Sequence, residues 1–396
     1  MGCTQSTTDR RSLSQNEIDE RIDSIKETCN STCGVVSLRY AYLSQRGYYP
    51  NAKRRPNEDS YIVTQKFAGR ESDAFFGVFD GHGKEGEKCS QYVRDTLSSL
   101  LAKDIGEVRV INGRVAPNIS KDLIEIPEKQ LETVIEESHK ECNRRMHASK
   151  RVDDSVSGTT SISVYLHGNL RKITVNNVGD SRAVMGSVAT PEQQEAAATA
   201  SSSLIASPLS CDHTPWRRDE RERIKKKGGR ILSWGQLFDK PPTKMFGKSP
   251  VVKDEKGELE LWETCDRQKV LGEVIDETGD PPRVWCRDRD FPGAAFTRSF
   301  GDEVAERKAG LFAEPEILIR ELTPQDKIIF LASDGVFEFL TNQQVIDICA
   351  ECTDPLEACR KVAAKSYELW MEKEPCSDDT TMICIFVDDV GSALDL

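Results

Sequence analysis

The 396-residue sequence contains no run of about 20 apolar residues, so no segment is predicted to span a bilayer. It has no excess of basic residues either, and its net charge of −12 argues against nucleic-acid binding, which usually needs a basic face. No apolar secretory segment opens the chain, and the thirteen cysteines lack the two Cys-x-x-Cys pairs of a zinc ribbon. We therefore expect a cytosolic globular protein with reduced thiols, long enough for one large domain or two smaller ones.

The opening residues, MGCTQS, match a lipidation signal. Removal of Met1 would expose Gly2 for myristoylation, and Ser6 stands at the hydroxyl position of that pattern. Because one myristoyl chain binds a membrane only marginally, palmitate on the neighbouring Cys3 would make the anchor stable. A chance match is the alternative. We predict a lipidated tether over residues 1–35 that holds the protein at the cytoplasmic face of a membrane.

The tether is polar and is expected to contribute nothing to the core. Its isoleucines at helical spacing, Ile18, Ile22 and Ile25, predict a short amphipathic helix.

Beyond the tether, short β-rich runs alternate with helical patterns. Apolar residues recur at helical spacing from Cys89 to Leu101 and from Leu131 to Met146. Because the strands gather around helices without regular βαβ alternation, we predict an α+β fold of antiparallel sheets covered by helices.

Three segments are expected at the surface. Residues 187–207 are low in complexity and predict a loop. Residues 217–227 predict a charged helix, whose mixed signs favour a solvated face over a phosphate-docking patch. Residues 232–292 form a charge-rich insertion.

Two apolar runs, "FFGVFDG" and "IIFLASDG", both end in Asp-Gly, at Asp80 and Asp334. A single such acid is more often a turn residue, because Asp satisfies its own turn backbone. If the two strand ends meet, however, their carboxylates would repel each other unless a cation neutralised them. Further acids flank other strands: Glu58, Asp59, Asp180, Asp378 and Asp379. Oxygen ligands without Cys or His select magnesium or manganese.

The sequence resembles the type 2C metal-dependent protein phosphatases, the PPM family. The resemblance lies in "RRPNED", "FFGVFDGHG", "SGTTSISV", "NNVGDSRAV", "TRSFGD", "ASDGVFE" and "SDDTTMICI", which occur in the order and spacing of that family. "LSQRGYYP", "PPRVW" and "SDGVFEFL" are similar to plant-type members. The resemblance implies one phosphatase domain over residues 36–390, an antiparallel β-sandwich flanked by helices on both faces (α-β-β-α layers). It also implies a monomer that acts on phosphoprotein substrates.

The resemblance assigns the acids to two ions, Mg²⁺ or Mn²⁺. Asp80 would bridge the two ions, and the carbonyl of Gly81 would complete the shell of one of them. Asp334 and Asp378 would hold the other ion, together with several waters. Asp180, with Asp334, would hold a weaker third ion.

Residues around the first motif are assigned in the same way. Glu58 and Asp59 match family acids that hold the first ion or its waters. Arg54 stands where the family places its phosphate-binding arginine, and Arg55 is the alternative if the register slips by one. Glu338 occupies a position where many members have aspartate, so its role stays open.

The implied chemistry is hydrolysis of phosphoserine and phosphothreonine. A water bridging two divalent ions would have a lowered pKa and would attack phosphorus in line, without a covalent enzyme intermediate. Arg54 would hold the phosphoryl oxygens, and His82 would protonate the departing oxygen. Outside these motifs, His82 would be interpreted as a turn histidine. We therefore predict a metal-dependent protein serine/threonine phosphatase.

Two further segments have counterparts in the family. The insertion at residues 232–292 lies where members place a flap near the active site, and its three tryptophans suggest that it selects protein substrates: Trp234, Trp262 and Trp285. Arg298, Gly301 and Asp302 of "TRSFGD" resemble a structural motif, so no direct catalytic role is expected for them.

The main alternative is a pseudophosphatase, a scaffold that keeps the fold to bind phosphoproteins. Loss of a metal-binding acid would favour it. Catalysis is favoured instead, because the residues that the family uses are all present: Arg54, Asp59, Asp80, His82, Asp334 and Asp378. A serine hydrolase or a P-loop NTPase is excluded, because neither Gly-x-Ser-x-Gly nor Gly-x4-Gly-Lys-Ser/Thr occurs.

Overall fold

The computed structural model describes residues 20–52, 55–108, 110–111, 114–115, 125–189, 203–238, 251–253, 259–261 and 281–391. Residues to which the sequence analysis gives roles and which lie outside these ranges are Gly2, Cys3, Ser6, Ile18, Arg54 and Trp262. The same holds for most of the 187–207 loop and most of the 232–292 insertion.

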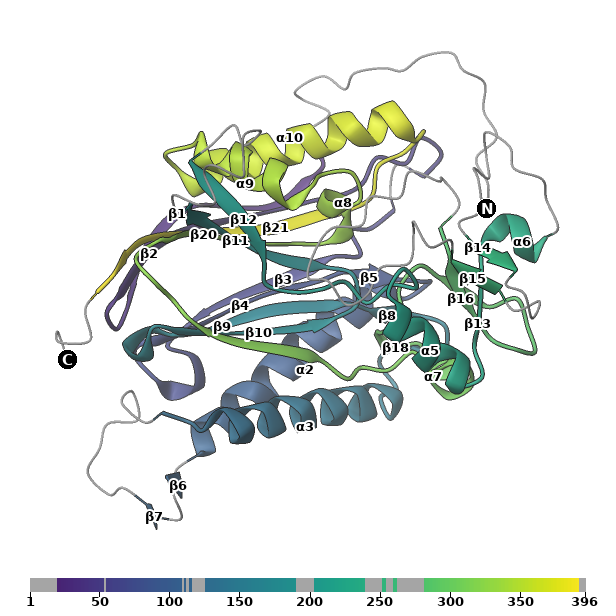
Figure 1. The fold of residues 1–396 in the computed structure, drawn as a ribbon, viewed down its shortest axis with the longest axis horizontal. Coiled ribbons are helices and arrows are strands. Elements are labelled where there is room, and N and C mark those ends of the chain that lie inside the picture. Colours follow the sequence, from purple (N-terminus) through teal and green to yellow (C-terminus); the bar gives the residue numbers. More distant parts are fainter. Residues whose placement is uncertain are drawn as a thin grey trace.

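Two antiparallel sheets face each other at the centre of the molecule (Figure 1). The first sheet has six strands, in the order β1 (Ile22–Cys33), β2 (Val36–Gln45), β21 (Thr380–Val390), β20 (Asp326–Ala332), β11 (Arg182–Val188) and β12 (Leu204–Pro208). The second has five, in the order β19 (Glu316–Glu321), β10 (Lys172–Val178), β9 (Ser161–His167), β4 (Asp73–Phe79) and β3 (Ser60–Gln65).

Helices cover the outer face of each sheet (Figure 1). The six-stranded sheet packs against α9 (Asn342–Ala350) and α10 (Pro355–Lys373), and the five-stranded sheet against α2 (Gly86–Glu107) and α3 (Glu128–His147). The predicted α-β-β-α layering is therefore confirmed. None of the helices in the described ranges is long and apolar enough to cross a membrane.

Strand β4 shows why its sequence is apolar at nearly every position. Phe76 and Val78 point into the core between the sheets, whereas Phe75 and Phe79 point outward into the core beneath α2. Because successive side chains of a strand face opposite sides, a strand covered on both faces needs apolar residues throughout. Burial of each large apolar side chain contributes about 1.5–3 kcal/mol.

Shorter elements surround the sandwich. A three-stranded sheet has the order β18 (Phe300–Gly301), β8 (Gly158–Thr159) and β5 (Gly81–His82), and another has the order β13 (Arg230–Leu232), β16 (Arg283–Trp285) and β17 (Pro292–Ala294). Two strand pairs are β6 (Val110–Ile111) with β7 (Arg114–Val115), and β14 (Val251–Lys253) with β15 (Leu259–Leu261). The remaining helices are α5 (Arg218–Lys226), α6 (Trp234–Leu237), α7 (Glu303–Ala309) and α8 (Asp334–Phe337), with 3-10 turns at Phe67–Gly69 and Gly168–Leu170.

The predicted tether over residues 1–35, with its amphipathic helix, is wrong for residues 22–33, which form the edge strand β1. The turn into β2 passes through Gly34, whose φ of +58° favours glycine. Thr28 Oγ1 of β1 donates a hydrogen bond to Asp354 Oδ2 at 2.5 Å. The helical spacing of the isoleucines does not decide the structure here, because the segment pairs along most of its length with β2, with irregularities after Ile22 and after Lys26.

Both described ends of the predicted 187–207 loop are strand rather than loop. Val188 of β11 pairs with Leu204 of β12, so the segment joins two neighbouring strands. Low complexity in the sequence did not reveal this pairing, because backbone hydrogen bonds do not depend on side-chain type.

The predicted solvated face of the 217–227 helix is also wrong in part. Glu220 is 1% exposed and accepts hydrogen bonds from Arg298 and Arg223, both at 2.7 Å. Arg217, 3% exposed, donates to Glu316 at 2.8 Å. We call these five residues the ion-pair network. Alternating charges in a sequence suggest exposure, but the main partners of this helix lie on distant segments.

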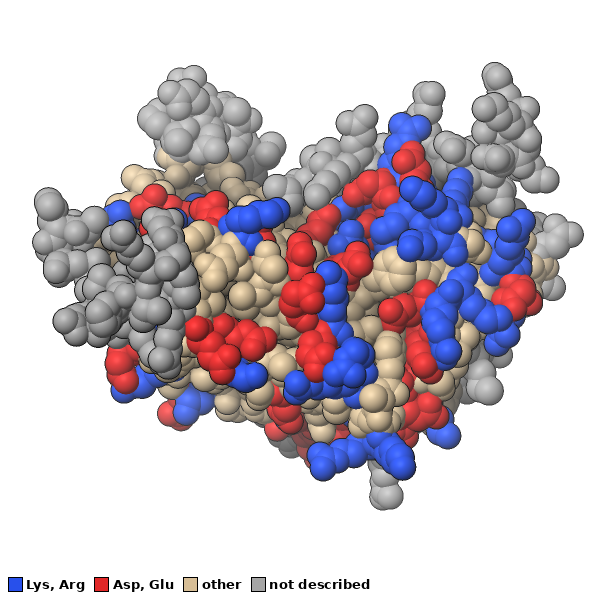
Figure 2. Space-filling model, turned by 90° about the horizontal axis from the view of Figure 1, so that it is seen from below, with Lys and Arg blue, Asp and Glu red and all other residues tan. Residues whose placement is uncertain are grey.

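The outer surface near α3 carries charged residues of both signs, some of which form exposed ion pairs. In the view from below, Lys and Arg are interspersed with Asp and Glu (Figure 2). Arg144 and Arg145 of α3, for example, each pair with Glu141 at 2.7 Å. Exposed pairs of this kind contribute about 0.3–0.5 kcal/mol each.

Candidate active site and metal centre

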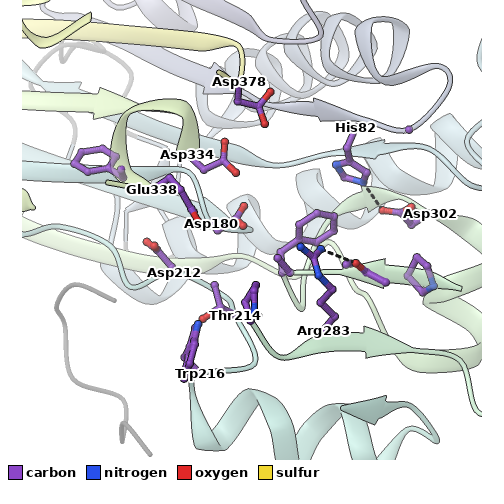
Figure 3. A pocket seen from close by; sticks show the side chains of 18 of the residues that line it. His82, Asp180, Asp212, Thr214, Trp216, Arg283, Asp302, Asp334, Glu338 and Asp378 are labelled. Atoms are coloured by element: carbon purple, nitrogen blue, oxygen red, sulfur yellow. Dashed lines mark hydrogen bonds and ion pairs between the residues drawn. The ribbon is translucent and has the colours of Figure 1, made fainter. Parts of the chain in front are cut away.

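Acids from the ends of both sheets gather around one pocket. Asp80 directly follows β4, Asp180 lies between β10 and β11, Asp334 follows β20 at the start of α8, and Asp378 precedes β21. The last three line a pocket of about 460 Å³ (Figure 3). All four side chains are half-buried. We call Asp80, Asp180, Asp334 and Asp378 the acidic edge.

The two Asp-Gly strand ends need glycine because other backbone segments pass close by. A Cβ on Gly335 would lie 1.9 Å from the carbonyl oxygen of Asp379, and one on Gly81 would lie 2.3 Å from that of Gly86. Neither glycine has a positive φ, whereas Gly83 does, at +88°. Close packing at the first two positions, and the turn at the third, hold the acidic edge rigidly.

Three carboxylates of the acidic edge, Asp80, Asp180 and Asp334, have raised pKa values. Burial, and then the charges of Asp334, Asp59 and Asp378, raise the pKa of Asp80 well above its usual range. Burial and the charge of Asp378 raise the pKa of Asp334 to about 6. Burial followed by the charge of Asp334 raises the pKa of Asp180. A cation among these carboxylates would remove the repulsion.

The donor atoms fit magnesium or manganese, because the acidic edge offers carboxylate oxygens and the Gly81 carbonyl follows Asp80 directly. Within the described ranges, no three His, Cys, Asp or Glu side chains form a complete ligand set around one point. Magnesium does not require such a set, because it usually binds through one or two carboxylates and keeps several waters.

The acids before β3 and β21 have different environments. Asp379 accepts hydrogen bonds from the backbone N–H groups of Gly47 at 2.6 Å and Glu58 at 2.7 Å, so it ties two segments together. Asp59 accepts a hydrogen bond from Ser333 Oγ at 2.8 Å, and burial raises its pKa well above the usual range. Burial also raises the pKa of Glu58.

Arg55, the alternative phosphate-binding residue, is linked to the acidic edge through its neighbours. Its guanidinium forms an ion pair with Glu58 and lies 4.5 Å from the ring centre of Tyr49. The Tyr49 hydroxyl donates to Asp378 Oδ1 at 2.7 Å. Because Arg54 lies outside the described residues, the choice between the two arginines stays a prediction.

Sequence reasoning missed Asp212, which lines the pocket. It forms an ion pair with the buried Arg182, Nε to Oδ1 at 2.9 Å, and its charge helps to raise the pKa of Asp180. Asp212 follows β12 closely, so recognition of that strand could have marked it as another strand-end acid. Glu338, whose role was left open, lines the same pocket.

His82 and Asp302 line the pocket together (Figure 3). His82 Nε2 lies 2.7 Å from Asp302 Oδ2, and the ring of Phe296 lies 4.5 Å from the imidazole. The expectation that Asp302 serves only a structural motif did not foresee this contact.

The described part of the insertion reaches the pocket through Arg283 of β16. Next to it, Trp234, 37% exposed, stacks on Phe238 with ring centres 5.3 Å apart. The Arg283 guanidinium lies 6.0 Å from the Trp234 ring. An exposed aromatic pair therefore adjoins a cation that faces the pocket.

The family model described as protein phosphatase 2C matches residues 50–371. This chain belongs to the protein phosphatase 2C family. It is 37% identical over 346 residues to probable protein phosphatase 2C 35 of Arabidopsis thaliana, which covers 87% of this chain and 83% of that relative. It is 28% identical over 358 residues to probable protein phosphatase 2C 75 of Oryza sativa subsp. japonica, covering 85% and 70%. The predicted likeness to plant-type members is confirmed.

Solved structures agree on the fold of this phosphatase. A serine-threonine phosphatase 2C from Toxoplasma gondii superimposes with a TM-score of 0.62 at 19% identity, covering 91% of this chain and 99% of the other. The protein is thus a protein serine/threonine phosphatase of a family that generally depends on Mg²⁺ or Mn²⁺.

Proposed function

We propose that this phosphatase hydrolyses phosphoserine and phosphothreonine at the acidic edge by direct attack of water, without a covalent enzyme intermediate. The crowding of Asp80, Asp334 and Asp378, which raises the pKa values of the first two, carries the proposal. Two divalent ions bound there would supply a water of lowered pKa. The residues that would hold the ions or their waters are Glu58, Asp59, Asp80, Gly81, Asp180, Asp334 and Asp378.

The other residues of the site act on the phosphate ester itself. Arg54, with Arg55 as the alternative, is assigned to bind the phosphoryl oxygens and to stabilise the charge that develops on them. His82, on the pocket wall, gives a proton to the serine or threonine oxygen as it departs.

The test is hydrolysis of a phosphothreonine peptide with and without Mn²⁺. We expect Mn²⁺-dependent turnover that falls at least about 1,000-fold in Asp80→Asn, since this change removes a carboxylate that would hold the ions. The matched control is Asp95→Asn, an exposed acid on α2, which should keep full activity. Metal-independent turnover, or full activity in Asp80→Asn, would contradict the mechanism. A folded parent without activity would favour a pseudophosphatase scaffold.

We propose that the protein is held on a cytoplasmic membrane face by myristate on Gly2 and palmitate on Cys3. The pattern MGCTQS supports this. In cell fractionation, Gly2→Ala should move the protein to the soluble fraction, and Cys3→Ser should weaken membrane retention, because one chain alone binds marginally. An unchanged membrane fraction in Gly2→Ala would count against lipidation.

We also propose that the insertion selects protein substrates through Trp234 and Phe238, which lie next to the pocket residue Arg283. The double change Trp234→Ala with Phe238→Ala should lower kcat/KM for phosphoproteins about tenfold and leave hydrolysis of p-nitrophenyl phosphate unchanged. Val188→Ala, another exposed apolar residue, is the control. An unchanged preference among phosphoproteins would refute the idea.

A further inference from the structure

The hydrogen bond between His82 and Asp302 occupies one of the two ring nitrogens of the pocket histidine. His82 Nε2 and Asp302 Oδ2 are 2.7 Å apart, and Ser299 Oγ donates to the same carboxylate oxygen at 2.7 Å. Asp302 is 2% exposed. This contact occupies Nε2, so it holds the imidazole by one of its two ring nitrogens. Nδ1 is then the nitrogen left for the substrate.

The small sheet β18-β8-β5 is built around this bond. Gly158 of β8 pairs with His82 of β5 on one side and with Gly301 of β18 on the other. A Cβ on Gly158 would lie 2.6 Å from Asp302 Oδ2 and 2.8 Å from His82 Nε2. The glycine therefore leaves open the space that the two bonded atoms occupy. Phe296 packs on the imidazole as well, which limits its rotation.

The backbone of Asp302 indicates that its side chain does not serve the helix that follows. Asp302 occupies the N-cap of α7 with a φ of +46°, which lies in the left-handed region that non-glycine residues rarely adopt. An aspartate at an N-cap normally accepts a hydrogen bond from the first turn, but this one makes no such bond. Its carboxylate contacts His82 and Ser299 instead.

We propose that Asp302 is a positioning residue for catalysis, which holds His82 through Nε2 and leaves Nδ1 directed at the leaving group. The inference rests on the proposed function, in which His82 is the proton donor. As the P–O ester bond breaks, its electron pair stays on the serine or threonine oxygen. Nδ1 gives its proton to that oxygen, and the neutral imidazole keeps its Nε2 proton toward Asp302.

Two substrates separate positioning of a proton donor from a structural role. A phosphothreonine peptide has a leaving oxygen that needs a proton, whereas p-nitrophenyl phosphate has one that departs without it. In Mn²⁺-loaded protein, Asp302→Asn should lower kcat for the peptide about 10- to 100-fold, keep KM, and change kcat for p-nitrophenyl phosphate less than about threefold. Ser299→Ala should show the same selectivity with a smaller loss, because it removes the second hydrogen bond to Asp302.

The matched control is Asp154→Asn, which removes one of the two carboxylates bonded to another histidine, His147, at 2.6 Å outside the pocket. It should not distinguish the two substrates. Asp302→Asn combined with His82→Ala should be no slower on the peptide than His82→Ala alone, because Asp302 acts through His82.

The outcomes separate this inference from the function on which it rests. A folded parent without Mn²⁺-dependent activity would overturn both. Three results with an active parent would overturn the positioning role alone. Asp302→Asn could lower kcat equally for both substrates, or it could have no effect. Its loss could also add in full to that of His82→Ala in the double variant. If Asp302→Asn unfolds, Ser299→Ala decides, and equal losses on the two substrates would again contradict the inference.

Discussion

The acidic edge and the ion-pair network both contain carboxylates with shifted pKa values, but these pKa values shift in opposite directions. In the network, burial would raise the pKa of Glu220, but hydrogen bonds from Arg298 and Arg223 outweigh it and hold the pKa well below its usual range. At the acidic edge, burial raises the pKa of Asp80, and the neighbouring charge of Asp334 raises it further.

The comparison shows how structural and functional acids differ within one protein. An acid matched by arginines can be buried without a ligand, because its charge is compensated by the fold. Acids that face one another destabilise the fold, and perturbed carboxylates of this kind in a pocket mark a functional site. Changes in the first cluster should therefore affect stability, and changes in the second should affect activity.

The largest expected effect is the loss of activity at the acidic edge. Asp334→Asn should lower kcat/KM at least about 1,000-fold, or about 4 kcal/mol, because it removes a metal-binding carboxylate. Without metal, its free energy of unfolding should be equal to or above that of the parent, since one repelling charge is gone. Urea unfolding in EDTA together with Mn²⁺-dependent hydrolysis tests both parts. A clear loss of metal-free stability in Asp334→Asn would contradict the claim that the acidic edge serves activity and does not stabilise the fold.

The ion-pair network should show the reverse. Glu220→Gln should lower the free energy of unfolding by about 3 kcal/mol, because it leaves Arg298 and Arg223 without their carboxylate. Activity per folded molecule should fall less than about tenfold. Glu222→Gln, on the exposed side of the same helix, is the control and should change stability by less than about 0.5 kcal/mol. Equal effects of the two changes in urea unfolding would contradict this role.

The neighbouring acids Asp378 and Asp379 should differ in the same way, one serving activity and the other stability. Asp379→Ala should cost about 2 kcal/mol of stability, because the N–H groups of Gly47 and Glu58 lose their acceptor. Asp378→Ala should instead mainly lower activity, since Asp378 lines the pocket. If Asp379→Ala is as stable as the parent in urea, the stabilising role that we assign to the two hydrogen bonds of Asp379 is wrong.

The smallest expected effect is on stability and concerns His147, whose imidazolium forms ion pairs with two acids. Burial alone would lower its pKa, but Asp154 and Glu306, bonded at 2.6 and 2.7 Å, raise it to about 9. Because this lies above the unfolded value of about 6.5, the stabilisation is complete below about pH 6.5 and is lost as the pH rises through 9.

After allowance for solvent screening, this stabilisation should be about 1 kcal/mol. Urea midpoints near pH 6 and pH 9.5 for the parent and His147→Gln measure it. The parent should lose more stability over this range than the variant, and parallel losses would refute the assignment.

The apolar strands and their terminal acids could be predicted from the sequence because they are local patterns. Strand β4 is apolar throughout since both of its faces are covered, and the Asp-Gly ends stand out against such runs. The same reasoning found α2 and α3 from their spacing.

Contacts between distant segments could not be predicted in this way. His82 and Asp302 are 220 positions apart, and only the small sheet that brings β5 and β18 next to β8 explains their hydrogen bond. Glu220 was interpreted as exposed because its partner Arg298 is remote in sequence. Strand β1 was missed because its backbone pairing leaves no side-chain pattern.

The most direct test of the account is Mn²⁺ binding to the full chain, measured by isothermal titration calorimetry for the parent, Asp80→Asn and Glu220→Gln. We expect the parent and Glu220→Gln to bind Mn²⁺ with the same affinity and Asp80→Asn to bind it at least about tenfold more weakly. Of the two substituted residues, only Asp80 belongs to the acidic edge. In the parent, Mn²⁺ at about 100 times its Kd should add about 2.7 kcal/mol to the free energy of unfolding. Equal Mn²⁺ affinity in the parent and Asp80→Asn would contradict the assignment of the acidic edge as the metal centre.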